Sequence, residues 1–245
     1  MKKTFIIIIA FINFYTIKGQ KTINKVEYSY RINNDFIQQE IIEKEKDEGL
    51  RRNLQMMNTS IKNNQNKLSF QLTFTEKESI YSLTKKLELD FDKEMMFVLA
   101  LTKAKDVVYT NLEEKYTLRK VSVLGEEFNV KTNLEAISWE MTQEQKLIGK
   151  YICFKAVKNS LFKKDLKIEA WYAPSISFGF GPKEYSGLPG LILELTENNI
   201  TYFAKEIKLN VKEDFKYDFK DKDKHLSQSK LDSIIVRFNN DRFKS

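Results

Sequence analysis

The chain has 245 residues, of which 42% are hydrophobic and 31% charged, and its formal net charge at pH 7 is +7. Acidic and basic side chains alternate along it, as in residues 43–48, whereas nucleic-acid-binding proteins gather positive charge on one face. We therefore expect no nucleic-acid partner. The single cysteine, Cys153, excludes an internal disulfide, so the fold must depend on its apolar core.

The N-terminus has the pattern of a signal peptide. Two lysines precede an apolar run over residues 5–12, and the small residue Gly19 follows. A membrane anchor needs about 20 apolar residues, and Asn13 interrupts this run. We expect residues 1–19 to be a cleaved signal peptide and residues 20–245 to form a single exported domain without a stable membrane span.

The first predicted strand spans residues 26–32, where apolar and polar side chains alternate. A long helical segment without proline is predicted next, over residues 36–63, and Gly49 could divide it into two helices. Its apolar residues recur at intervals of four, three and four, which places them on one stripe: Leu50, Leu54, Met57 and Ile61. We expect this stripe to cover one face of a sheet.

Beyond this segment the apolar period changes to two, which predicts short strands. The candidates span residues 68–74, 80–83, 95–101, 107–112, 116–124, 128–130, 152–156, 166–170, 191–195 and 200–209. Their spacing predicts an antiparallel meander, with a hairpin turn at Gly125. Residues 226–238 then predict a C-terminal helix.

Residues with special backbone properties are concentrated in residues 170–195, which hold all three prolines and four of the eight glycines. Glycine enters conformations that other residues avoid, and proline fixes φ, so this segment needs a particular path. A phosphate-binding loop would open a helix rather than a strand. A Ser-Lys dyad among Ser177, Lys183 and Ser186 has no distinctive spacing. A rigid corner between two parts of the sheet is the favoured interpretation.

The same segment carries a family resemblance. Residues 187–192 read GLPGLI, and Trp139, Cys153, residues 170–172 (AWY) and residues 181–182 (GP) precede them. In this order they resemble the GLPGLI family of exported bacterial envelope proteins, well over residues 139–195 and loosely before that. The resemblance implies a periplasmic or outer-membrane-associated location and brings no catalytic residue. The family pattern is also similar to lipoprotein carriers, whose curved antiparallel sheet has an apolar concave face.

Few side chains suited to catalysis or metal binding are present. The only histidine, His225, lies in a charged run, which is a poor place for a catalytic triad. A structural zinc site needs about four Cys or His ligands, and the chain has two. Cys153 should point away from the face that carries Ile152 and Phe154, as a packed thiol if that side is covered and a reactive one if it is open. We expect no metal and no cofactor.

Together these patterns predict an α+β fold: a single curved antiparallel sheet resembling a lipoprotein-carrier half barrel, with the long helical segment after the first strand and a C-terminal helix. The predicted function is a non-enzymatic binding or carrier protein for an apolar ligand or peptide, held on a concave face lined by Phe70 and Phe74 among others. The predicted binding residues are Trp171, Phe180, Gly181, Pro182, Gly187, Leu188, Pro189 and Gly190.

The alternative is a docking component of an outer-membrane transport or peptide-export system, with an envelope protein as partner. A third hypothesis, a hydrolase, has the least support. A carrier needs an internal apolar cavity, whereas a docking protein needs an exposed apolar patch and a filled core. A hydrolase needs polar groups that converge in a cleft.

Overall fold

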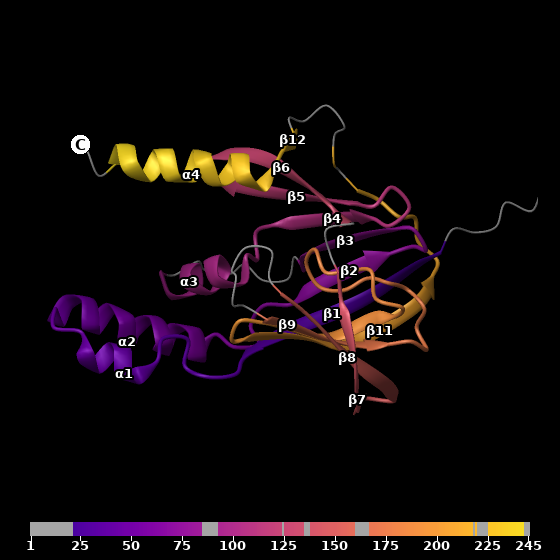
Figure 1. Cartoon of the computed structure of the whole chain (residues 1–245), viewed down its shortest axis with the longest axis horizontal. Helices are drawn as coiled ribbons and strands as arrows, with labels where there is room; N and C mark the ends of the chain where they lie inside the picture. The colour runs from indigo at the N-terminus through magenta and orange to yellow at the C-terminus, as the bar shows by residue number, and fades with distance from the viewer. Residues whose placement is uncertain are drawn as a thin grey trace, which may run out of the picture.

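The computed structural model describes residues 22–84, 93–123, 125–134, 138–159, 167–217, 219 and 225–242. Within these ranges, twelve strands form one sheet in the order β12-β6-β5-β4-β3-β2-β1-β11-β10-β9-β8-β7, accompanied by four helices (Figure 1). The predicted signal peptide lies outside the described residues. No helix in these ranges is long and apolar enough to cross a membrane.

The strands are β1 (Ile23–Ile32), β2 (Phe70–Phe74), β3 (Glu78–Leu83), β4 (Val107–Asn111), β5 (Tyr116–Val123), β6 (Glu126–Asn133), β7 (Glu140–Ile148), β8 (Tyr151–Asn159), β9 (Lys167–Ala173), β10 (Leu191–Glu197), β11 (Ile200–Val211) and β12 (His225–Leu226). The helices are α1 (Gln39–Lys44), α2 (Glu48–Asn63), α3 (Lys93–Thr102) and α4 (Gln228–Arg242).

The sheet corrects the predicted fold class. Strand β12 pairs in parallel with β6, through His225 and Leu226, so the sheet is mixed rather than wholly antiparallel. It begins at β12 and ends at β7 and is open. Parallel strands require a long connection, and the chain between β6 and β12 contains the strands β7 to β11. The predicted antiparallel half barrel is therefore wrong.

The prediction of a long helical segment after the first strand is also wrong. The short helix α1 and the 16-residue helix α2 are separate, and Glu45 between them is extended, with φ −69° and ψ 123°. Asp47 then begins α2, because its carboxylate accepts a hydrogen bond of 2.8 Å from the backbone N–H of Leu50. Gly49 lies inside the first turn of α2 and not at the break.

Residues 95–101 form most of helix α3 and not the predicted strand. Their apolar run is continuous, and such a run does not distinguish a buried helix from a buried strand. The buried side chains are Met95, Val98 and Leu99, at helical spacing. The predicted C-terminal helix is present as α4.

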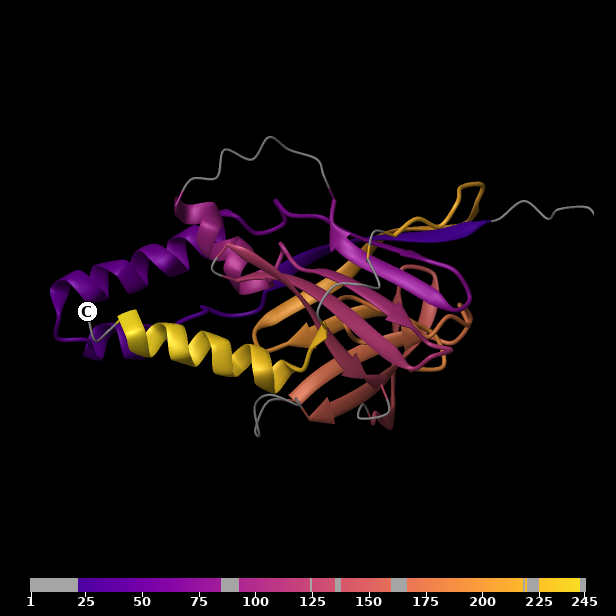
Figure 2. The same cartoon turned by 90° about the horizontal axis from the view of Figure 1, so that it is seen from above.

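The core lies on the inner face of the sheet, where buried tyrosines fasten other parts of the chain. Tyr202 donates a hydrogen bond to the carbonyl of Thr102 at the end of α3 (3.2 Å), and Tyr30 donates one to the carbonyl of Asn64 after α2 (2.5 Å). Each tyrosine thus satisfies its hydroxyl while burying its ring. Helices α2, α3 and α4 extend from the same end of the sheet (Figures 1 and 2).

Candidate functional site

Residues 174–190 connect β9 to β10 and fold onto the inner face of the sheet; we refer to them as the Pro/Gly loop. Phe180 is fully buried, and its ring centroid lies 5.6 Å from that of Phe74 on β2. Phe178 contacts the same ring at 5.1 Å. Ile176 and Leu188 belong to the same buried core. The loop therefore fills the space in which an apolar ligand was expected.

Two glycines permit this close packing. A Cβ added to Gly190 would lie 2.3 Å from the carbonyl oxygen of Ala173, and one added to Gly181 would lie 2.6 Å from Cδ1 of Ile192. Gly187 has φ +90°, a conformation that favours glycine. The glycines thus serve a fixed backbone path.

Of the eight predicted binding residues, seven lie together on this loop and one lies elsewhere. Phe180, Gly181, Pro182, Leu188 and Gly190 are buried, whereas Gly187 and Pro189 are exposed. Trp171 alternates along β9 with the buried Ala170 and Tyr172, so it points to the opposite face. Binding by these residues stays a prediction, and most of them are enclosed by the protein itself.

A buried ion pair fastens the Pro/Gly loop to the end of β10. Lys183 has φ +57°, and its Nζ lies 2.5 Å from Oε2 of Glu197. Tyr185 donates a hydrogen bond of 2.9 Å to the other carboxylate oxygen. Burial alone would raise the pKa of Glu197, but Lys183 and the hydrogen bond from Tyr185 bring it below its ordinary value. The lysine ammonium is thus committed to the carboxylate, which leaves no support for a Ser-Lys dyad.

A second buried lysine lies beside this pair. The Nζ of Lys158, at the end of β8, is 5.5 Å from the ring centroid of Trp139 and 5.1 Å from that of Tyr185. The indole N–H of Trp139 donates to the carbonyl of Ser186 at 2.9 Å, so the residue that directly precedes β7 is bonded to the loop. Burial lowers the pKa of Lys158, while Glu184 and Glu197 oppose the shift.

Sequence reasoning missed the roles of Lys158 and Glu197. A signal for Lys158 was present, because Ile152, Phe154 and Ala156 define one face of β8 and Lys158 continues the same alternation. A lysine at an inward position of a strand is unusual. No comparable signal marks Glu197, whose partner becomes a neighbour only when the loop folds back.

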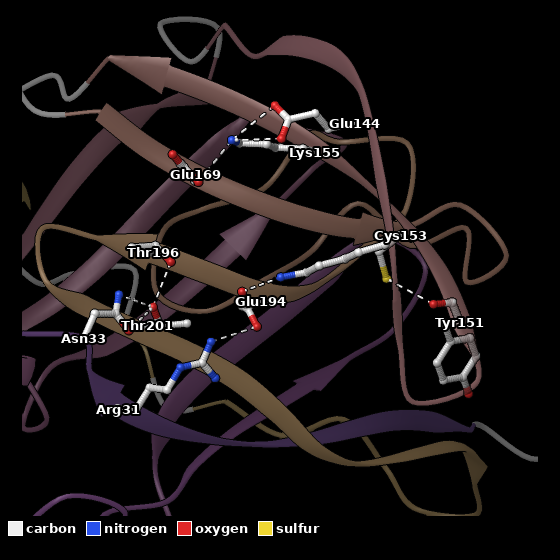
Figure 3. A network of polar contacts seen from close by, with 11 residues as sticks. Arg31, Asn33, Glu144, Tyr151, Cys153, Lys155, Glu169, Glu194, Thr196 and Thr201 are labelled. Carbon is white, nitrogen blue, oxygen red and sulfur yellow. Dashed lines mark hydrogen bonds and ion pairs between the residues drawn. The ribbon is translucent and has the colours of Figure 1, made fainter.

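The opposite face of the sheet carries an exposed network of charges (Figure 3). Arg31 and Lys146 bind the two carboxylate oxygens of Glu194, at 3.1 and 2.7 Å. The Nζ of Lys146 also lies over the ring of Trp171, 4.2 Å from its centroid. Lys155 lies within 3.4 Å of Glu144 and Glu169. These groups satisfy one another, which is typical of a solvated surface.

Cys153 lies beneath this network, on the face opposite Phe154, and is fully buried, so of the two alternatives it is the packed thiol. Its Sγ is 3.6 Å from the carbonyl oxygen of Tyr151 (Figure 3). Burial raises the pKa of the thiol to about 11, so it is protonated and unreactive at neutral pH.

The apolar stripe of α2 is only partly covered. Ile61, nearest the sheet, is 3% exposed, Met57 and Leu54 are half-buried, and Leu50 is 47% exposed. The helix extends beyond the end of the sheet (Figure 2) and contacts the helices α3 and α1, and only Ile61 of the stripe belongs to the buried core. The expectation that the stripe covers one face of the sheet is confirmed for Ile61 alone.

A pocket of about 200 Å³ lies at the base of α2, between this helix and residues 32–36. Its polar lining includes Asn33, Asp35 and Lys62, and Asn58 in its wall bonds both the N–H and the carbonyl of Ile37. Such a lining suits water or a polar group better than an apolar ligand. Within the described ranges, no cluster of three or more His, Cys, Asp or Glu residues could hold a metal ion.

Solved structures resemble this chain in fold. Two crystal structures of PNGF-II, in space groups P21 and C2, align with TM-scores of 0.55 and 0.54 and sequence identities of 14% and 15%. Each alignment covers 88% of this chain and 33% of that chain, so the chain spans about a third of the structures it matches. At this identity the likeness concerns the fold alone.

An uncharacterized conserved protein from Thermus thermophilus aligns with 8% identity and a TM-score of 0.36, over 84% of this chain and 91% of its own. No curated protein matches the sequence. The family model Porph_ging, described as a protein of unknown function, matches residues 158–194. This match is consistent with a GLPGLI-type family, whose name stays a prediction, and its segment contains Lys158, Lys183 and the whole Pro/Gly loop.

Proposed function

We propose that this protein is an exported, non-enzymatic envelope protein that docks onto an amphipathic helix of another envelope protein through α2. The observation that carries the proposal is the loss of cover along the α2 stripe, from the buried Ile61 to the exposed Leu50. An apolar helix face that becomes exposed toward one end is a candidate site for a partner. The inner face of the sheet, by contrast, is occupied by the protein's own Pro/Gly loop, which favours docking over carriage of an apolar ligand.

The width of the stripe favours a helix over a membrane as its partner. Leu50, Leu54, Met57 and Ile61 span only about 60° of the helix circumference, at about 100° per residue. A narrow seam with intervals of four, three and four is typical of helix pairing. A helix lying in a lipid interface needs a wider apolar face with aromatic residues, and this stripe has none.

The charges beside the stripe indicate an acidic partner. Arg51 lies about 90° from the centre of the stripe, at its flank, whereas Arg52 lies about 170° away on the far side. Arg51 is 3.8 Å from Glu48 at a partly exposed position, so its charge is weakly paired. Flanking charges of this kind select partners of opposite sign. We therefore expect acidic residues beside the apolar seam of the partner.

Site-specific crosslinking tests this proposal. A photoreactive amino acid at position 50 should crosslink a helical, acidic segment of one other envelope protein in the native host, and one at position 55, on the polar face, should not. With that partner purified, Leu50→Glu should weaken binding at least about tenfold because it places a charge in the seam, while the control Gln55→Glu adds the same charge outside it.

A charge reversal tests whether the partner is acidic, apart from whether it contacts the apolar stripe. Arg51→Glu should weaken binding and remove most of its salt dependence, whereas Arg52→Glu should leave both unchanged. Crosslinks to lipid or to a second copy of this chain, or equal effects of the two reversals, would contradict the proposal. Lipid that co-purifies in native mass spectrometry would favour the carrier instead.

A further inference from the structure

Two lysines near Tyr185 are buried to a similar extent, and among the described residues only Lys183 has a carboxylate in contact with its amine. Lys183 is 8% exposed and Lys158 is 7% exposed. Lys183 contacts Glu197 at 2.5 Å. Within the described part of the chain, the side-chain amine of Lys158 has no hydrogen bond or ion pair; its neighbours are the rings of Trp139 and Tyr185. A buried ammonium without a close carboxylate is costly, and this burial lowers the pKa of Lys158, although the two aromatic rings favour the ammonium.

The charged groups that face Lys158 act from a distance. Glu184 and Glu197 raise its pKa through space, but burial has the larger, opposite effect and the net shift is downward. A second observation points to a ligand here: the side-chain oxygen of Ser186 is buried and has no hydrogen-bond partner. Ser186 belongs to the same group of residues, because its carbonyl binds the Trp139 indole. A buried hydroxyl without a partner leaves a polar group of a ligand something to bind.

We propose that Lys158 is a nucleophilic amine that captures small neutral aldehydes as imines, in a site walled by Trp139 and Tyr185. The lone pair of Nζ attacks the carbonyl carbon, and one N–H proton moves to the carbonyl oxygen to give a carbinolamine. The hydroxyl then leaves with the second N–H proton as water, and the C=N bond forms. The step is neither an oxidation nor a reduction, and hydrolysis reverses it.

The surroundings define the class of ligand. The slight exposure of Lys158 admits only a small molecule at the amine. Glu184 disfavours an anionic one, such as an α-keto acid, by like-charge repulsion, whereas the charge of Glu197 is balanced by Lys183. Aromatic walls suit an apolar substituent. Small neutral aldehydes satisfy all three conditions, and this inference is independent of docking through α2.

Reductive trapping provides the test. The folded full-length protein is treated with limiting acetaldehyde and cyanoborohydride at pH 7, digested and mapped by mass spectrometry. Each unit by which the pKa of one amine lies below another raises its neutral fraction about tenfold. We expect Lys158 to be ethylated before exposed lysines such as Lys208 and well before Lys183. Modification of Lys158 no earlier than the exposed lysines would overturn the proposal.

Two further experiments distinguish the reactivity of the Lys158 amine from its accessibility to the reagent. Glu184→Gln removes a carboxylate that raises the pKa of Lys158, so it should speed trapping at Lys158 at neutral pH. The control Glu169→Gln, on the opposite face, should not. Glyoxylate, which is small but anionic, should modify Lys158 more slowly than it modifies Lys208. An unchanged rate in Glu184→Gln, or equal use of both aldehydes at Lys158, would contradict the proposed site.

Discussion

The substitution Gly190→Ala tests whether the Pro/Gly loop is a close-packed corner. The added Cβ would lie 2.3 Å from the carbonyl oxygen and 2.6 Å from the carbonyl carbon of Ala173, where real Cβ contacts stay beyond 3.0 Å. The backbone of β9 and the loop must therefore separate by about 0.7 Å. Both atoms are main chain, so no side-chain rotation relieves the contact. Overpacking of this kind costs 1–3 kcal/mol or more, and we expect about 3 kcal/mol.

Gly187→Ala is the matched control, because it changes the same residue type in the same loop for a different reason. Its Cβ would meet nothing within 4 Å, but φ is +90°, so only the backbone strain of about 1–2 kcal/mol remains. Thermal unfolding followed by tryptophan fluorescence measures both. For a chain of this size we expect the melting temperature of Gly190→Ala to fall by about 6–12 °C. A smaller loss for Gly190→Ala than for Gly187→Ala would refute the packing argument.

Two further predictions concern buried groups. Lys183→Met should cost about 3–5 kcal/mol, because it leaves the Glu197 carboxylate buried without its partner. Because the pKa of Glu197 is lowered from its ordinary value of 4.5 in the folded wild type, this carboxylate stabilises the wild type at neutral pH, and the contribution is lost as the pH falls through the lowered pKa. In Lys183→Met, burial raises the pKa of Glu197, so protonation relieves the destabilisation as the pH falls. The difference in unfolding free energy between the two proteins should therefore shrink from pH 7 to pH 4. The Cys153 thiol should react with a disulfide reagent only after unfolding, and prompt labelling of the native protein would contradict its burial.

Strands with a regular alternation were predictable from sequence. In β2 the side chains alternate between buried and half-buried along Phe70–Phe74, and the sequence has the same period. The rigid corner was likewise indicated by the glycines and prolines, because their backbone requirements are local. Features that depend on such local signals can be predicted from a short stretch of sequence, since no distant contact needs to be known.

Features that depend on distant contacts were predicted less well. The apolar run 95–101 became α3 because it packs on the inner face near Tyr202, where a helix end meets the tyrosine hydroxyl. The break between α1 and α2 follows from the Asp47 cap, which competed in the sequence with the more conspicuous Gly49. The parallel pairing of β12 required the return path of the chain across the sheet, which no short pattern records.

The candidate site shows the same division. The loop was identified, but the partner of Lys183 was not, because Glu197 lies at the far end of the next strand and meets Lys183 only after the loop packs inward. Trp171 was grouped with the loop by its position in the sequence, yet the alternation of β9 sends it to the opposite face. The alternation of side chains along β9 was readable from the sequence, and it is better evidence for the face that a side chain occupies than nearness along the chain.

The filled inner face also makes carriage of an apolar ligand energetically unfavourable. A ligand that enters there must displace Phe180 and Leu188, and exposing each buried side chain costs about 1.5–3 kcal/mol. The resulting cost of about 3–6 kcal/mol, before the Lys183–Glu197 pair is disturbed, would weaken the apparent affinity by about two to four orders of magnitude. A partner helix on Leu50 meets no such cost, because that surface is already exposed. The position of the uncovered apolar surface therefore favours docking at α2 more strongly than the curvature of the sheet favours a carrier.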